Sequence, residues 1–275
     1  MKRISEFKGA HPVIFSALII LITDVFFIPI KMLYSLENAS NIHCLIREII
    51  VAIFSVALVF ASGQRHIYKC GTKNLFKGLW SGFIFVALAG MGCSVFIADG
   101  IAAGREFKSA PEIAAFIAFV LFIGIAEESV CRGIVTDVLL ARFGKSKGGI
   151  WAAVLLSGLF FGLFHITNVF SQSVGETIIQ MIATSMTGIL LSAVYVRHKN
   201  IFAPMLLHAL LDFMTMTDGG FFAGRSIIET ASTESFDFWS ELGWALIAQG
   251  TFVIVAVFIL RPKILKKIVE DTKNV

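Results

Sequence analysis

Long apolar stretches constrain this chain more than any other feature of its sequence. A helix that crosses a bilayer needs about 20 mostly apolar residues. Eight such stretches occur, near residues 12–33, 45–63, 79–98, 111–131, 149–168, 174–196, 200–217 and 239–260. They leave little of the 275-residue chain for a soluble domain. We therefore predict an all-α, polytopic membrane helix bundle of about eight transmembrane helices, with residues 1–275 forming a single membrane domain.

Composition excludes the other common classes of protein. Apolar residues make up 57% of the chain and charged residues 15%, whereas soluble proteins carry about 25% charged residues. The apolar content also excludes a disordered chain. The four cysteines have no paired spacing, which argues against a disulfide scaffold. The remaining prediction is a multi-pass protein of the cell membrane, surrounded by the lipid bilayer.

Basic residues predict how the bundle is oriented. Loops rich in Lys and Arg stay in the cytoplasm, and most of the 23 Lys and Arg residues fall on one side of the predicted spans. That side includes both ends of the chain, so both termini are predicted to be cytoplasmic. The same asymmetry accounts for the net charge of +4, and we expect no nucleic-acid partner. The sequence leaves the oligomeric state open.

Charged groups inside predicted spans are candidate functional residues, because a charge in a bilayer is costly unless it is paired or hydrated. Most of those identified fall on the fourth, fifth and seventh predicted helices. They are Asp24, Glu112, Glu127, Glu128, Arg132, His165, His208 and Asp212. This clustering predicts one polar pocket.

Two adjacent glutamates lie near the end of the fourth span. Glu128 and Arg132 are four residues apart, so their side chains share a helix face and can neutralise each other. Glu127 is rotated by about 100° from Glu128, which makes its carboxylate a candidate proton acceptor or donor. The alternative is that all three form one structural ion cluster.

Two histidines complete the candidate set. If the fourth and fifth helices form a hairpin, Glu127 and His165 lie at similar depth and can meet. His208 and Asp212 share a face of the seventh helix. Counted from the predicted helix starts, however, His208 and His165 differ in depth by about 12 Å. An irregular helix start near Pro204 is one solution, and the sequence leaves the question open.

In combination, these residues resemble the motifs of the CPBP family, the type II CAAX prenyl protease and bacteriocin-processing membrane proteins, also called the Abi family. The family motifs EExxxR, FxxxH and HxxxN/D are matched by Glu127-Glu128-xxx-Arg132, Phe161-xxx-His165 and His208-xxx-Asp212. All three motifs fall in order within residues 111–217, the predicted catalytic core. Cys131 departs from the family pattern, in which an aromatic residue often precedes the arginine.

The resemblance implies hydrolysis of a peptide bond inside the membrane, with a membrane-associated protein or peptide as substrate. It implies that Glu127 and His165 activate a water and that Glu128 and Arg132 support them. His208 and Asp212 would stabilise the oxyanion or position the substrate. The last pair fits the chemistry, because hydrolysis needs hydrogen-bond donors where negative charge develops.

The sequence leaves open whether the protein binds a divalent metal ion. Histidine nitrogens and carboxylate oxygens suit zinc, and Glu127, His165 and His208 would be its ligands. No HExxH motif occurs, and these residues lie on three different helices. A metal-free mechanism with the same glutamate and histidine is the alternative.

Two other classes of function compete with the protease. Intramembrane charges also build proton relays, so a proton-coupled transporter is one alternative. The other is a catalytically inactive immunity or partner-binding membrane protein that keeps the fold.

Overall fold

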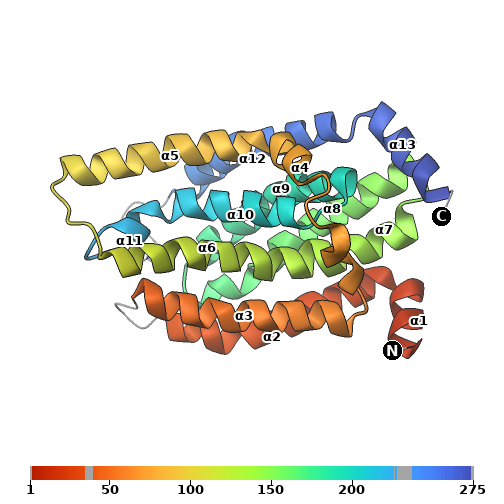
Figure 1. The fold of residues 1–275 in the computed structure, drawn as a ribbon, viewed down its shortest axis with the longest axis horizontal. Coiled ribbons are helices and arrows are strands. Elements are labelled where there is room, and N and C mark those ends of the chain that lie inside the picture. The colour runs from red at the N-terminus through yellow and green to blue at the C-terminus, as the bar shows by residue number, and fades with distance from the viewer. Residues whose placement is uncertain (1, 35–39, 226, 228–236, 274–275) are drawn as a thin grey trace.

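The computed structural model describes residues 2–34, 40–225, 227 and 237–273, which form a bundle of roughly parallel and antiparallel helices (Figure 1). The helices are α1 (Lys2–Ala10), α2 (Pro12–Tyr34), α3 (Asn41–Ala61), η1 (Arg65–Cys70), α4 (Leu75–Ser81), α5 (Phe83–Ala102), α6 (Ala110–Val130), η2 (Cys131–Thr136), α7 (Asp137–Phe143), α8 (Lys147–Leu163), η3 (Ile166–Phe170), α9 (Val174–His198), α10 (Phe202–Thr215), α11 (Thr217–Phe221), α12 (Phe238–Ile259) and α13 (Pro262–Lys273). The described residues contain no strand, only an isolated bridge between Phe107 and Phe222. The predicted all-α class is confirmed.

Seven helical runs among the described residues are long and apolar enough to cross a membrane. They are Pro12–Ile30, Asn41–Ala61, Phe83–Ala102, Ala110–Phe143, Lys147–Phe170, Val174–His198 and Phe238–Ile259. The eighth predicted span, 200–217, contains α10, which has only 14 residues and packs against α5 and α6. The chain is therefore a polytopic membrane bundle in which one predicted span is a short helix inside the protein.

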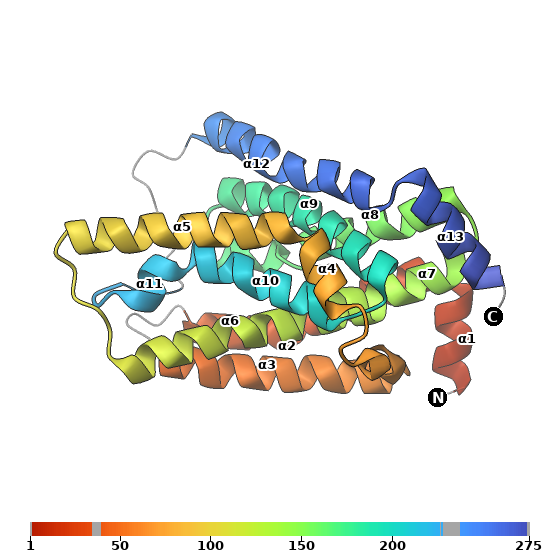
Figure 2. The ribbon, with the colours of Figure 1, turned by 45° about the horizontal axis from the view of Figure 1, so that its top comes forward.

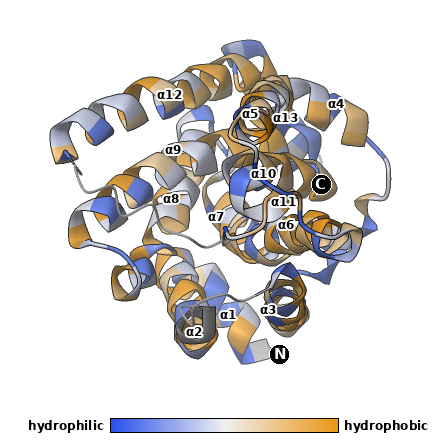
Figure 3. Cartoon of the chain, turned by 90° about the vertical axis from the view of Figure 1, so that its left-hand side faces the viewer, coloured by the Kyte–Doolittle hydropathy of each residue, from blue (hydrophilic) through white to orange (hydrophobic). Residues whose placement is uncertain are grey.

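Apolar side chains cover the outside of the bundle as well as its core. Figure 3, which looks along the helices, shows apolar residues throughout the long helices, those at the outside of the bundle included. Leu21 on α2, Ile53 on α3 and Phe258 on α12 are 57%, 64% and 68% exposed. An apolar surface of this extent is stable in contact with lipid rather than water.

Serine side chains mark the starts of several helices. Ser40 accepts a hydrogen bond from the His43 amide at the start of α3, and Ser146 accepts one from the Gly149 amide at the start of α8. Ser173 and Glu176 form a reciprocal capping box at the start of α9. Each cap satisfies backbone N–H groups that have no partner within the helix.

Helix α6 packs against both α3 and α10, while α9 packs against α8 and α12. Glycines allow the close approaches. A Cβ added at Gly124 on α6 would collide with the carbonyl oxygen of Met205 on α10, and one at Gly162 on α8 would collide with Ser185 on α9. Small residues bring membrane helices into direct backbone contact in this way.

A π-helical turn, η2, follows α6 and continues into α7, so the fourth predicted span, 111–131, extends further than expected. The Thr136 hydroxyl donates to the Cys131 carbonyl oxygen at 2.9 Å, which matches the five-residue spacing of a π turn, and contacts the Ser157 hydroxyl at 2.6 Å. Such turns are frequent at functional sites. This one begins three residues after Glu128.

Both termini of the described chain lie at the same end of the bundle, beside α1 and α13 (Figure 1). Termini on the same side require an even number of crossings, and the seven candidate spans give an even number when α10 is counted as a further crossing. The assignment of that end to the cytoplasm remains a prediction from the charge asymmetry.

Candidate active site

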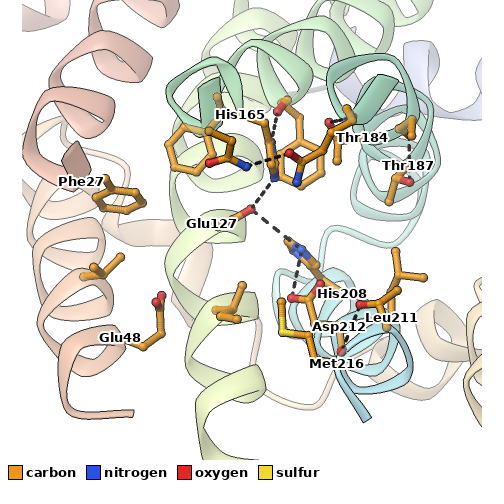
Figure 4. A pocket seen from close by; sticks show the side chains of 18 of the residues that line it. Phe27, Glu48, Glu127, His165, Thr184, Thr187, His208, Leu211, Asp212 and Met216 are labelled. Atoms are coloured by element: carbon orange, nitrogen blue, oxygen red, sulfur yellow. Dashed lines mark hydrogen bonds and ion pairs between the residues drawn. The ribbon is translucent and has the colours of Figure 1, made fainter. Parts of the chain in front are cut away.

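Three separate helical segments carry the candidate residues to one place. Glu127 and Glu128 lie in the last turn of α6, and Arg132 follows in η2. His165 lies two residues after the end of α8, and His208 and Asp212 lie on α10. Figure 4 shows Glu127 from α6 reaching between the two histidines.

Glu127, His165, His208 and Asp212 line one cavity of about 450 Å³. The Glu127 Oε2 atom is 4.0 Å from His165 Nε2 and 3.9 Å from His208 Nε2. The Glu127 and His165 side chains are only 17% and 13% exposed. One carboxylate oxygen is thus shared between two imidazoles at a distance slightly longer than a direct hydrogen bond.

Backbone geometry at the end of α8 orients His165. The last turn tightens, so the His165 amide donates to the Gly162 carbonyl oxygen at 3.0 Å. The His165 Nδ1 atom lies 2.9 Å from the Phe161 carbonyl oxygen. Because a carbonyl only accepts, Nδ1 carries the proton and Nε2 faces Glu127.

The Glu128 carboxylate orients His208 and is itself held by Arg132. Glu128 Oε1 accepts from Arg132 Nη1 at 2.7 Å and from His208 Nδ1 at 3.0 Å. The Glu128 and Arg132 side chains are both 0% exposed. Arg132 also donates to the Gly188 carbonyl oxygen at 3.1 Å. The expected ion pair of Glu128 and Arg132 is present, and the same Glu128 oxygen also accepts a hydrogen bond from His208.

Phe161, the aromatic residue of the FxxxH pattern, lies between these groups. The Arg132 guanidinium carbon is 4.4 Å from the centre of its ring. Both imidazoles meet the ring edge-on, with centroids 5.2 Å away for His165 and 5.4 Å for His208. The ring therefore fixes the spacing of the two histidines and stabilises the buried cation.

The expected depth difference of about 12 Å between His165 and His208 is wrong, since both contact the same carboxylate. The estimate assumed that each helix starts at the membrane surface. Instead, the start of α10 is packed against neighbouring helices, with Ile201 and Ala203 fully buried. The Asn200 side chain accepts from the Ala203 amide and caps this buried start.

Asp212 lies beside His208 as the four-residue spacing predicts. Its Oδ2 atom is 3.5 Å from His208 Nε2, and Figure 4 shows both side chains directed into the cavity. The proximity allows Asp212 to orient or neutralise the imidazole.

Glu48 is a cavity residue that the sequence analysis missed. It lies on α3, is 8% exposed, and faces the cavity from the side opposite α10 (Figure 4). The rule that charges inside predicted spans are candidates would have found it, because it falls within the predicted span 45–63. Uncharged polar residues also line the cavity: Asn168, Gln180, Thr184, Thr187 and Gln249.

Asp24 and Glu112, the other charged candidates, do not line the cavity. Asp24 is buried on α2. Glu112 accepts a hydrogen bond from the Asn41 amide at 2.7 Å and joins the starts of α3 and α6. Glu112 therefore has a structural role.

The donor types at Glu127, His165 and His208 suit zinc, and each histidine has its Nδ1 proton bonded to an acceptor, as metal-binding histidines usually do. Their separations of 3.9 and 4.0 Å are wider than about 3.4 Å, the donor spacing of a tetrahedral zinc site. Among the described residues, no three His, Cys, Asp or Glu side chains are placed to hold a metal ion. The donor types thus suit zinc, but the donor atoms lie farther apart than they would around a bound ion.

The fold and the site together define a multi-pass membrane protein with a buried pocket of carboxylates and imidazoles. The family described as type II CAAX prenyl endopeptidase Rce1-like matches residues 109–214. The chain therefore contains an Rce1-like domain, which confirms the family resemblance and supports a protease. No curated protein and no solved structure is significantly similar to the chain.

Proposed function

We propose that this chain is an intramembrane endopeptidase that hydrolyses a peptide bond of a membrane-associated protein or peptide. One observation carries the proposal: Glu127 Oε2 is about equally far from the Nε2 atoms of His165 and His208, inside a cavity lined in part by helices long and apolar enough to cross a membrane. An oxygen atom of water bridges polar groups separated in this way. The Rce1-like domain over residues 109–214 supports the same reaction class.

In the proposed mechanism, Glu127 and His165 position the attacking water. His165 Nδ1 donates to the Phe161 carbonyl, so Nε2 accepts one hydrogen of the water. Glu127 accepts the other hydrogen and takes that proton as the water oxygen attacks the carbonyl carbon. Glu127 then returns the proton to the leaving nitrogen as the C–N bond breaks. The products are a carboxylic acid and an amine.

His208 and Asp212 are assigned to the developing oxyanion. A proton on His208 Nε2, 3.5 Å from Asp212 Oδ2, is available for donation to substrate oxygen. Glu128 holds the opposite ring nitrogen at 3.0 Å, and Arg132 holds Glu128. Glu128 and Arg132 are thus positioning residues.

The cavity walls support an apolar substrate segment. Phe27 from α2, Val51 from α3 and Leu211 from α10 line the space around the polar centre. An apolar wall with a few convergent polar groups is typical of a ligand site.

Zinc bound by Glu127, His165 and His208 stays a separate prediction. Such an ion would lower the pKa of its bound water to about 7. No step above depends on it. Metal analysis of the purified wild-type protein and of a His165→Ala variant tests it, and a bound equivalent lost in the variant would support it.

Peptide comparison tests the proposed activity. Membrane and secreted peptides from wild-type cells are compared with those from Glu127→Ala cells. The matched control is Glu106→Gln, which changes an exposed glutamate outside the cavity. We expect a product that is absent only in Glu127→Ala cells. Identical peptides at equal protein abundance, under every growth condition, would contradict the protease and favour the partner-binding alternative.

A further inference from the structure

A second cavity, of about 950 Å³, lies at the end of the bundle that carries both termini. It is formed by η1, α4, the start of α7, the end of α9 and α13. Three of the elements that form it, α4, α7 and α13, can be followed in Figure 2. It shares no lining residue with the catalytic cavity.

The lining of this cavity is strongly basic. Six Lys and Arg residues line it, with only two carboxylates. The basic residues are Lys69, Lys73, Lys77, Arg197, Lys199 and Lys267. One carboxylate, Asp137, is already bonded to His66 Nε2 and to Tyr195 Oη, both at 3.1 Å. In the described part of the chain, Lys73, Lys77 and Lys199 form no ion pair within 4.0 Å, which leaves their charges for a ligand.

Side-chain hydrogen bonds hold the frame of the cavity in place. Asn200 donates to the backbone carbonyls of Gly71 and Lys73 at 3.0 and 2.8 Å, which ties the segment before α4 to the end of α9. Asn74 donates to the His198 carbonyl at 3.1 Å. The lysines therefore project from a fixed backbone rather than from free loops.

Lys199 occupies a backbone conformation that glycine or asparagine normally takes. It ends α9 with a φ of 50°, in the left-handed region. The surrounding protein desolvates its amine and lowers its pKa, an effect that Asp137 partly offsets. An anion in the cavity would stabilise the charged amine.

Exposed aromatic rings on α4 indicate the level of this cavity in the membrane. Phe76 and Trp80 are 76% and 77% exposed on the same helix as Lys77. Tryptophan side chains such as Trp80 gather at the headgroup level of a bilayer. On the other side, α13 packs Leu265 into the bundle while Lys266 and Lys267 stay exposed, the pattern of a helix lying in the interface.

From the six basic side chains, the fixed frame and the interfacial aromatics, we propose that this cavity binds the phosphate-bearing headgroup of an acidic phospholipid. Basic pockets between membrane helices recognise such headgroups. The proposal is independent of the protease mechanism, because the two cavities are separate.

The test titrates the purified full-length protein with dioctanoyl phosphatidylglycerol, dioctanoyl phosphatidylcholine or inorganic phosphate, read by native mass spectrometry. The site variant is Lys73→Gln/Lys77→Gln/Lys199→Gln. The matched control, Lys145→Gln/Lys147→Gln/Lys263→Gln, removes the same charge from exposed positions outside the cavity. A Lys73→Arg/Lys77→Arg/Lys199→Arg variant keeps the positive charge at all three positions and serves as a second control.

We expect saturable phosphatidylglycerol binding that weakens by about tenfold or more in the site variant. The control and arginine variants should bind within about twofold of wild type. If the site variant does not fold, Lys199→Asn, which tolerates the left-handed backbone, should still weaken binding by about threefold. Equal losses in the control variant would show diffuse surface attraction and overturn the proposal. Equally tight binding of phosphatidylcholine or of inorganic phosphate would overturn the lipid assignment.

Discussion

At the scale of single residues, Glu128 connects the stability of this protein to its proposed chemistry. One of its oxygens accepts from both Arg132 and His208, and neither Glu128 nor Arg132 has any exposed side-chain surface. A change at Glu128 therefore leaves a buried cation without its counter-charge and also releases the His208 imidazole.

Glu128→Gln should destabilise the protein by about 3–5 kcal/mol, because Arg132 stays buried without its ion-pair partner. A Glu128→Leu/Arg132→Met variant removes both charges and should recover most of that stability. It should not recover activity, because His208 still lacks its Nδ1 acceptor. Unfolding in detergent and product formation measure the two effects. Full activity of the double variant would contradict the positioning role of Glu128.

Asp212 offers a separate residue-scale test. Asp212 Oδ2 lies 3.5 Å from His208 Nε2, and an asparagine side chain can place a polar oxygen at the same position, so Asp212→Asn should keep activity within about threefold of wild type. Asp212→Leu removes the polar group beside His208 and should lose about tenfold or more in activity. Initial rates at equal protein abundance check both values. Equal activity of the two variants would show that Asp212 has no role in the reaction.

At the scale of elements, the contact between α8 and α9 decides where His165 lies. Gly162 is three residues before His165, and its missing side chain lets α8 approach the Met181 carbonyl and Ser185 on α9. The π turn η2 and the buried start of α10 similarly place Arg132 and His208. Each of these three features, the Gly162 contact, the π turn and the buried helix start, sets the register of one helix against its neighbours.

Gly162→Ala should destabilise the protein by about 1–3 kcal/mol and reduce activity, because the added methyl group pushes α8 away from α9. Gly90→Ala on α5 is the matched control, since nothing lies within 4 Å of its added Cβ. The control should leave stability unchanged or slightly higher. Thermal unfolding and product formation measure the outcome, and equal behaviour of the two variants would contradict a tight α8–α9 contact.

At the scale of the whole molecule, the charge asymmetry and the shared end of the termini make a topological prediction. Single cysteines are placed in a cysteine-free background at Ser146, between α7 and α8, and at Glu106, between α5 and α6. A membrane-impermeant maleimide should label Glu106→Cys in intact cells but Ser146→Cys only after lysis. The reverse pattern would contradict a cytoplasmic location of both termini.

The sequence predicted most of the fold because its signals are local. Hydropathy identified segments that match seven spans, and the four-residue spacings correctly placed Glu128 beside Arg132 and His208 beside Asp212. The missed features depend on contacts between distant segments. Neither the π turn after α6 nor the depth of α10 is visible in a hydropathy profile.

By itself, the sequence determined that the chain forms an apolar helical bundle and that its polar residues lie on particular helix faces, since both follow from periodicity along one segment. Only the tertiary structure decided that α6, α8 and α10 bring two imidazoles to one carboxylate oxygen, with Glu48 across the same cavity. The reason is that helix depth and rotation are set by packing between helices, at glycine contacts such as Gly124 and Gly162.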